Sequence, residues 1–165
     1  MCRNEKRMRR CCFTGHRPEK LMGGMAHIQM KLQFEIERAI ADGFGTFITG
    51  MARGIDLIAA EFVLAMQKNG MPTHLICASP YVGFETRWSA DWQERYRNVL
   101  NSADIVRYAS PVYNRDCFQA RNEWMVDHSS RLIAVYNGSP GGTQNTIEYA
   151  RKRGLDIKII YEEML

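Results

Sequence analysis

Short apolar runs alternate with helix-length segments along almost the whole of this 165-residue chain. We predict six strands, at residues 11–14, 46–49, 73–78, 103–108, 132–136 and 157–160. The segments between them carry apolar residues at helical spacing or read as helix-like. Strands that alternate with helices of this length need crossover connections, which produce a parallel sheet covered on both faces. The pattern therefore predicts a single three-layer, doubly wound α/β domain.

Size and composition fit one soluble globular domain. Apolar residues make up 45% of the chain and charged residues 24%, which are ordinary values. We assign residues 1–10 to a basic N-terminal arm and residues 11–165 to the domain. No apolar run is long enough to cross a bilayer, and no stretch resembling a secretory signal follows the basic residues. We therefore expect a cytoplasmic protein without a membrane partner.

The cysteine count and the net charge limit the cofactors and binding partners that we expect. Five cysteines are an odd number, and they show no spacing typical of a zinc site. We expect reduced thiols, no metal site and no required cofactor. The formal net charge is +4, and the arm supplies much of the excess. The arm either contacts nucleic acid or an acidic partner or is a solvated terminus, and we favour the second interpretation. The sequence leaves open whether two copies form a homodimer.

Three glycine-bearing stretches, at residues 14–18, 49–56 and 140–143, each follow a predicted strand and precede a helix-like segment. If these strands are parallel neighbours, the loops meet at one rim of the sheet, where backbone N–H groups and helix N-termini attract phosphate. A tight connection needed only for packing is the alternative for residues 49–56. The predicted ligand contacts are Thr14, Gly15, Arg17, Gly50, Met51, Ala52, Gly54, Asn122, Gly141, Gly142 and Thr143.

Charged side chains supply the chemistry that we expect at this rim. Arg17 offers planar donors suited to phosphate, although a surface arginine beside an ordinary turn has the same local sequence. We expect the fourth and fifth strands to be adjacent, so that Arg121 and Glu148 face each other over the ligand. Arg121 would then bind phosphate, and Glu148 would act on a ribose hydroxyl or an attacking water. A structural ion pair or two solvated helix residues are the alternative.

The sequence lacks the signature motifs of several classes of enzyme. No Gly-Lys-Ser/Thr of a nucleotide triphosphatase occurs, and neither does the Gly-x-Ser-x-Gly of serine hydrolases. The cysteines stand in no signature of cysteine catalysis. ATP hydrolysis at a Walker-type site and covalent nucleophilic catalysis therefore have no support.

Four motifs in order, at residues 14–18, 48–56, 121–128 and 132–143, resemble those of the YpsA-like family. That family belongs to the SLOG superfamily, which joins the DNA-processing protein A (Smf) proteins with the "lonely guy" phosphoribohydrolases. The resemblance covers residues 11–160. It implies a Rossmann-like sheet with strand order 3-2-1-4-5-6 and a ligand site at the loops named above, thought to hold nucleotides or nucleotide-derived molecules.

The phosphoribohydrolases carry a Pro-Gly-Gly-x-Gly-Thr-x-x-Glu motif and an upstream arginine. Residues 140–142 and Glu148 fit that motif and Arg121 fits the arginine, whereas Gln144 and Asn145 stand where Gly-Thr is expected. The missing glycine would have let phosphate approach the helix start. This departure weakens the expectation of hydrolysis more than that of ligand binding.

We therefore expect a protein that binds or senses a phosphorylated nucleotide-like ligand such as an ADP-ribose or NAD-related species. The alternative is an enzyme that cleaves the N-glycosidic bond of a nucleoside monophosphate, with Arg121 and Glu148 as its catalytic residues. Single-stranded DNA binding is the third possibility. Residues 50–56 are closer to the DNA-processing branch, whose members bind single-stranded DNA, but the chain shows no evident basic groove, so we rank this activity last.

Overall fold

The computed structural model describes residues 2–21 and 24–162 and contains one sheet of six parallel strands. The first residue of the predicted arm and the last three of the predicted domain lie outside the described residues. The strands are β1 (Arg10–Gly15), β2 (Thr46–Thr49), β3 (His74–Tyr81), β4 (Ile105–Ser110), β5 (Arg131–Tyr136) and β6 (Asp156–Tyr161).

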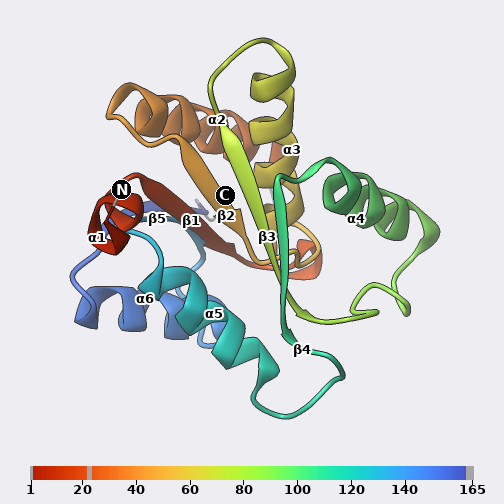
Figure 1. The fold of residues 1–165 in the computed structure, drawn as a ribbon. Coiled ribbons are helices and arrows are strands. Elements are labelled where there is room, and N and C mark those ends of the chain that lie inside the picture. The colour runs from red at the N-terminus through yellow and green to blue at the C-terminus, as the bar shows by residue number, and fades with distance from the viewer. Residues whose placement is uncertain (1, 22–23, 163–165) are drawn as a thin grey trace.

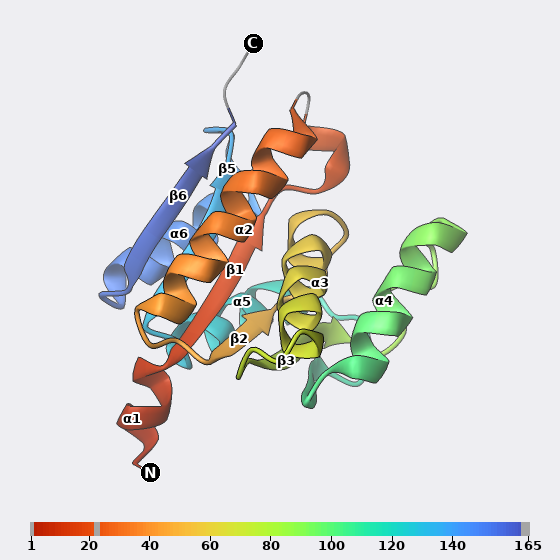
Figure 2. The same ribbon diagram turned by 90° about the horizontal axis from the view of Figure 1, so that it is seen from above.

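Helices cover both faces of this sheet, and the predicted three-layer α/β class is confirmed. The helices are α1 (Arg3–Met8), α2 (Met25–Ala41), α3 (Ile55–Lys68), α4 (Ala90–Ser102), α5 (Cys117–Asp127) and α6 (Gly142–Lys152), with a short 3-10 helix at Pro18–Lys20. Figures 1 and 2 show α2, α3 and α4 on one face and α5 with α6 on the other. Within the described residues, no helix combines the length and the apolar character that a membrane span requires.

The strand order is β4-β3-β2-β1-β5-β6, so the predicted order 3-2-1-4-5-6 is wrong in the place of the fourth strand. β4 lies at the edge beside β3, and β5 pairs with β1. Residues 105–109 of β4 are all exposed, whereas residues 131–135 of β5 are all buried. A strand with neighbours on both sides and helices on both faces must be largely apolar, and of these two strands β5 meets that condition from Leu132 onward.

Alternating side chains along the strands divide the core between the two faces of the sheet. Cys11 and Phe13 of β1 pack with α2, α3 and α4, whereas Cys12 between them packs with α5 and α6. This period of two is the geometry of any strand. Both faces are thus sealed, which leaves the ends of the strands as the places where polar groups can gather.

The predicted basic arm is partly helical. It lies at the opposite end of the sheet from the three glycine-bearing loops at residues 14–18, 49–56 and 140–143. α1 precedes β1, and the Nε of Arg7 donates a hydrogen bond to the carbonyl oxygen of Ser129 at 3.0 Å. Figure 2 shows α1 at the N-terminal end of β1. The basic residues of α1 therefore do not contribute to the rim where β1 ends.

Candidate ligand-binding site

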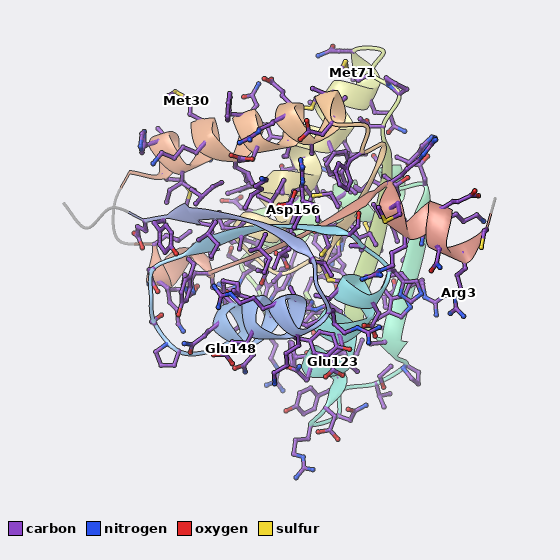
Figure 3. All side chains as sticks on the ribbon, turned by 90° about the vertical axis from the view of Figure 1, so that its left-hand side faces the viewer. Arg3, Met30, Met71, Glu123, Glu148 and Asp156 are labelled. Atoms are coloured by element: carbon purple, nitrogen blue, oxygen red, sulfur yellow. The ribbon has the colours of Figure 1, made fainter. Side chains whose placement is uncertain are left out.

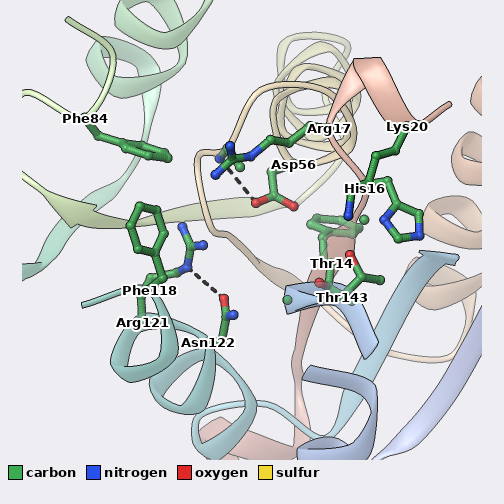
Figure 4. Close-up of a pocket in the computed structure, with 14 residues that line it drawn as sticks. Thr14, His16, Arg17, Lys20, Asp56, Phe84, Phe118, Arg121, Asn122 and Thr143 are labelled. Atoms are coloured by element: carbon green, nitrogen blue, oxygen red, sulfur yellow. Dashed lines mark hydrogen bonds between the residues drawn. The ribbon is translucent and has the colours of Figure 1, made fainter. Parts of the chain in front are cut away.

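The three predicted loops follow β1, β2 and β5, which are neighbours in the sheet. Because neighbouring parallel strands end at the same edge, the loops gather there around a cavity of about 340 Å³ (Figure 4). Eight of the predicted site residues line this rim cavity: Thr14, Gly15, Arg17, Ala52, Arg121, Asn122, Gly142 and Thr143.

Five predicted site residues do not line the rim cavity: Gly50, Met51, Gly54, Gly141 and Glu148. The side chain of Met51 is fully buried in the core, on a backbone with a positive φ of 65°. Gly54 packs against the loop after β1, because a Cβ there would lie 2.9 Å from the carbonyl oxygen of His16. Gly141 caps the start of α6.

Glu148 is exposed on α6 and points away from the sheet (Figure 3). The expectation that it would face Arg121 depended on adjacent fourth and fifth strands, and those strands are not adjacent. Arg121 does line the rim cavity, but it extends from α5 beneath β3 and β4. The structure therefore does not bring the predicted catalytic pair together across this cavity.

Gly15 is needed for packing at the end of β1. A Cβ at this position would lie 2.5 Å from the Cβ of Ile55 and 2.6 Å from its Cγ2. Both atoms are fixed close to the backbone of α3, so neither can move aside cheaply. The glycine thus lets α3 begin directly against the strand, which brings the first turn of that helix to the rim.

Asp56 lies in this first turn and is a feature that the sequence prediction left out of the site. Its side chain is buried, and its Oδ2 accepts a hydrogen bond from the backbone N–H of Ala52 at 3.2 Å. Its Oδ1 is also buried and has no hydrogen-bond partner among the described residues. Burial raises the pKa of Asp56 to about 6, against the opposing effects of Arg121, the Ala52 N–H and Arg17.

Arg121 approaches Asp56 from the opposite face of the sheet. It is buried, its Nε donates to the Oδ1 of Asn122 at 2.8 Å, and its Nη1 donates to the carbonyl oxygen of Gly50. A Cβ at Gly50 would lie 2.8 Å from the Oδ2 of Asp56 and 3.2 Å from the Cζ of Arg121. Glycine at this position therefore lets a buried cation and a buried carboxylate pack against one backbone segment.

His16 is the second buried polar side chain that the sequence prediction left out. The backbone N–H of Asn137 donates to its Nε2 at 3.1 Å, which leaves the ring proton on Nδ1. Burial lowers the pKa of His16, and Lys20 lowers it further. The imidazole is therefore neutral at pH 7 and joins the loop after β1 to the loop after β5.

The remaining lining residues add charge and aromatic surface. Lys20 is exposed at the mouth, while Phe13, Phe84 and Phe118 contribute rings to the wall (Figure 4). These residues had no signal of their own in the sequence, because they lie outside the glycine stretches or, as with Phe13, inside a strand. Asp56 did have one, since an acidic residue in the first turn of a helix is expected to face the N-terminal N–H groups.

The rim cavity carries a net positive charge at pH 7. Arg17, Lys20 and Arg121 contribute three cations against the one carboxylate of Asp56. The first N–H groups of α6 lack partners within the helix, and Gly142 and Thr143 present them to the cavity. Among residues 2–21 and 24–162, no group of three or more His, Cys, Asp and Glu side chains could hold a metal ion. This donor set suits a phosphate group.

Comparison with known proteins gives matches over nearly the whole chain. Residues 11–165 match the family model YpsA, described as the YspA SLOG family. The SPbeta prophage-derived protein YoqJ of Bacillus subtilis (strain 168) is 33% identical over 141 residues, covering 78% of this chain and 82% of that protein. A UPF0398 protein of Bacillus cereus (strain B4264) is 29% identical over 160 residues, covering 89% of this chain and 85% of that protein.

Solved structures of DNA processing protein A share the fold. The protein from Streptococcus pneumoniae superposes with a TM-score of 0.67 at 18% identity, covering 96% of this chain and 52% of that chain. The protein from Helicobacter pylori gives a TM-score of 0.60 at 18% identity, covering 95% of this chain and 66% of that chain. This chain thus spans between 52% and 66% of the length of these two proteins.

Proposed function

For this chain, which belongs to the YspA SLOG family, we propose that the rim cavity binds a nucleotide or nucleotide-derived phosphorylated ligand of the ADP-ribose or NAD class. On this proposal the protein is a binding or sensing module. Saturable binding without turnover is then its expected behaviour.

One observation carries the proposal: cations and helix N–H groups converge on a single cavity whose walls are partly aromatic. Arg17 and Arg121 provide guanidinium donors, and the start of α6 provides backbone donors at Thr143. Asp56 lines the same cavity, and its carboxylate is an acceptor suited to a ribose hydroxyl. Phosphate, sugar and ring therefore each have a matching group in one place.

Thermal-shift and calorimetric titrations with ADP-ribose, NAD, nucleoside monophosphates and nucleotide sugars test the proposal. Arg17 is exposed, so Arg17→Ala should leave the fold intact. A charge-assisted hydrogen bond contributes about 1.5–3 kcal/mol, so the variant should lose about 10- to 150-fold in affinity. Arg38→Ala is the matched control, because Arg38 is half exposed on α2 and does not line the rim cavity.

Three results would contradict this proposal. The first is a wild-type protein that none of these ligands stabilises. The second is an Arg17→Ala variant that binds as tightly as the wild type. The third is an equal loss of affinity in Arg38→Ala, which would assign the effect to general surface charge instead of the rim cavity.

N-glycosidic cleavage of a nucleoside monophosphate is a second candidate, favoured by the buried carboxyl of Asp56. In this reaction water adds its hydroxyl group to C1′ of the ribose, and the base leaves with a proton. A pKa raised to about 6 suits a group that moves protons near neutral pH. Release of free base that Asp56→Asn abolishes and Glu148→Gln preserves would support Asp56. The reverse pattern would support Glu148, and absence of release from any monophosphate would reject the enzyme.

Single-stranded DNA binding is a third candidate, supported by the shared fold with a Helicobacter pylori protein whose structure is described as binding single-stranded DNA. DNA held by the basic arm would bind at the opposite end of the sheet from the rim cavity. Affinity should then fall steeply between about 50 mM and 200 mM salt and be lost when residues 2–9 are removed. Affinity that survives this truncation would exclude the arm as the binding element.

A further inference from the structure

A second cavity, of about 490 Å³, adjoins the rim cavity. Arg17, Phe84 and Phe118 line both, so the two spaces share a wall. We call the second one the aromatic cavity, because five of its lining residues carry rings: Tyr81, Phe84, Trp88, Tyr113 and Phe118. They come from the end of β3, the loop after it, the segment that leads into α5, and the first turn of α5.

Edge-to-face packing holds these rings. The centroids of Phe84 and Trp88 are 4.9 Å apart at an interplanar angle of 73°, and those of Phe84 and Phe118 are 5.5 Å apart at 68°. The rings of Tyr81 and Tyr113 are 5.6 Å apart at 78°. Each ring is thus held in place by the edge or face of its neighbour.

Tyr113 is the ring most open to solvent. Its exposed fraction is 64%, although its neighbours Tyr81 and Phe118 are partly buried. An exposed aromatic residue beside a cavity of this size is a surface suited to a planar ligand. Stacking on it would cover the ring without disturbing the packed core.

Arginines complete the wall of the aromatic cavity. Arg53 is held by Glu19 at 2.7 Å and lies 5.9 Å from the ring centroid of Trp88. Arg87 and Arg17 are exposed at the same cavity. Guanidinium planes and aromatic rings together are the pair of groups on which nucleobases stack, and their positive charge favours an anionic ligand.

We propose that the aromatic cavity holds the base of a free nucleotide whose phosphate occupies the rim cavity. The inference rests on the proposed function and adds to it that the protein recognises the base. Arg17 lies on the wall between the two cavities, where the phosphate and the sugar would meet. A phosphorylated sugar without a base would use only half of the site.

Calorimetric titration with AMP and with ribose 5-phosphate tests this inference, because the two probes differ only in the base. Stacking on aromatic side chains should make AMP bind about 5- to 150-fold more tightly than ribose 5-phosphate. Tyr113→Ala should lower the affinity for AMP and leave that for ribose 5-phosphate unchanged. Tyr113→Phe keeps the ring and should restore the preference. Phe34→Ala is the matched control, since Phe34 is 60% exposed on α2 and lines neither cavity.

The failures of the two proposals are distinguishable. Equal affinities for AMP and ribose 5-phosphate, or a Tyr113→Ala variant that loses both equally, would overturn the base site and leave the phosphate site intact. Binding of neither probe would overturn the base site, and it would overturn the phosphate site as well if ADP-ribose, NAD and the nucleotide sugars also failed to bind. A thymidine oligonucleotide of about twelve residues that displaces AMP and binds more tightly would assign the two cavities to a strand and overturn a free nucleotide as the occupant.

Discussion

Replacing Asp56 by asparagine should change how the stability of this protein depends on pH. The carboxyl group is buried beside Arg121, and one of its oxygens has no hydrogen-bond partner among the described residues. Asparagine has nearly the same shape and can still accept the hydrogen bond from the N–H of Ala52. It carries no charge at any pH, so the comparison of the two proteins isolates the ionisation of Asp56.

The expected size follows from the shift in pKa. A rise from the ordinary value of 3.8 to about 6 corresponds to about 3 kcal/mol of differential interaction. The folded state binds the proton more tightly than the unfolded state. The stabilisation is therefore fully present below the unfolded pKa and is lost as the pH rises through about 6. Relative to Asp56→Asn, the wild type should lose about 3 kcal/mol of unfolding free energy between about pH 4 and pH 7.

Urea denaturation of both proteins from about pH 3 to pH 7.5 measures this difference. The pKa of His16 is also lowered, but His16 is present in both proteins and its contribution cancels. Asp104→Asn is a control of opposite sign. Burial tends to raise the pKa of Asp104, but hydrogen bonds from the N–H of Leu75 and from His74 lower it overall. Its stabilisation is present above pH 3.8 and is lost as the pH falls.

A difference between wild type and Asp56→Asn that stays constant with pH would refute the reasoning. So would a wild type that loses unfolding free energy relative to Asp56→Asn as the pH falls, because that slope belongs to a carboxylate with a lowered pKa. A constant difference would mean that the carboxyl of Asp56 is solvated. The opposite slope would mean that it is fully paired with Arg121, so that the acceptor proposed for a ribose hydroxyl is already occupied.

Two further substitutions test the packing that positions the rim. Gly15→Ala should destabilise the fold by about 1–3 kcal/mol in urea denaturation, because the new methyl group overlaps Ile55. Gly45→Ala is the control: the atom nearest to its new methyl group is 3.7 Å away, so stability should change by less than about 1 kcal/mol. Tyr96→Phe should lower the free energy of unfolding by about 1–3 kcal/mol in the same assay, because it removes the 2.8 Å hydrogen bond between Tyr96 and Ser79 and leaves the buried hydroxyl of Ser79 without its partner. An unchanged denaturation midpoint in Gly15→Ala or Tyr96→Phe would contradict the contact that the variant tests.

The sequence predicted the layers and the gathering of the loops, because both depend on local patterns. Apolar runs that alternate with helices dictate a parallel sheet, and glycine loops after parallel strands must lie at its C-terminal rim. The place of the fourth strand was mispredicted because neighbour choice is a tertiary property. The sequence did contain an indication of the correct strand order. The polar Arg107 and the mixed character of β4 are typical of an edge strand, whereas residues 132–136 of β5 are apolar apart from the tyrosine hydroxyl, as in a central strand.

Other features depend on contacts between distant segments and left no local pattern. The aromatic cavity combines Tyr81 with Tyr113 and Phe118, which only the pairing of β3 with β4 and the packing of α5 bring together. β3 also continues through Pro80, which the sequence marks as a strand end. Proline is tolerated there because β3 pairs with β2 only up to Cys77, and because the register with β4 pairs Ser79 and Tyr81 but not Pro80.

The meeting of Arg121 and Asp56 beside Gly50 has a wider consequence for how this protein can evolve or be engineered. Arg121 is carried by α5, whose position depends on the core beneath the sheet, while Asp56 is carried by α3, whose position depends on the core above it. The spacing of these two charges therefore reports how the halves of the interior are aligned. Conservative substitutions deep in either half, far from any ligand, should tune affinity well before they threaten folding.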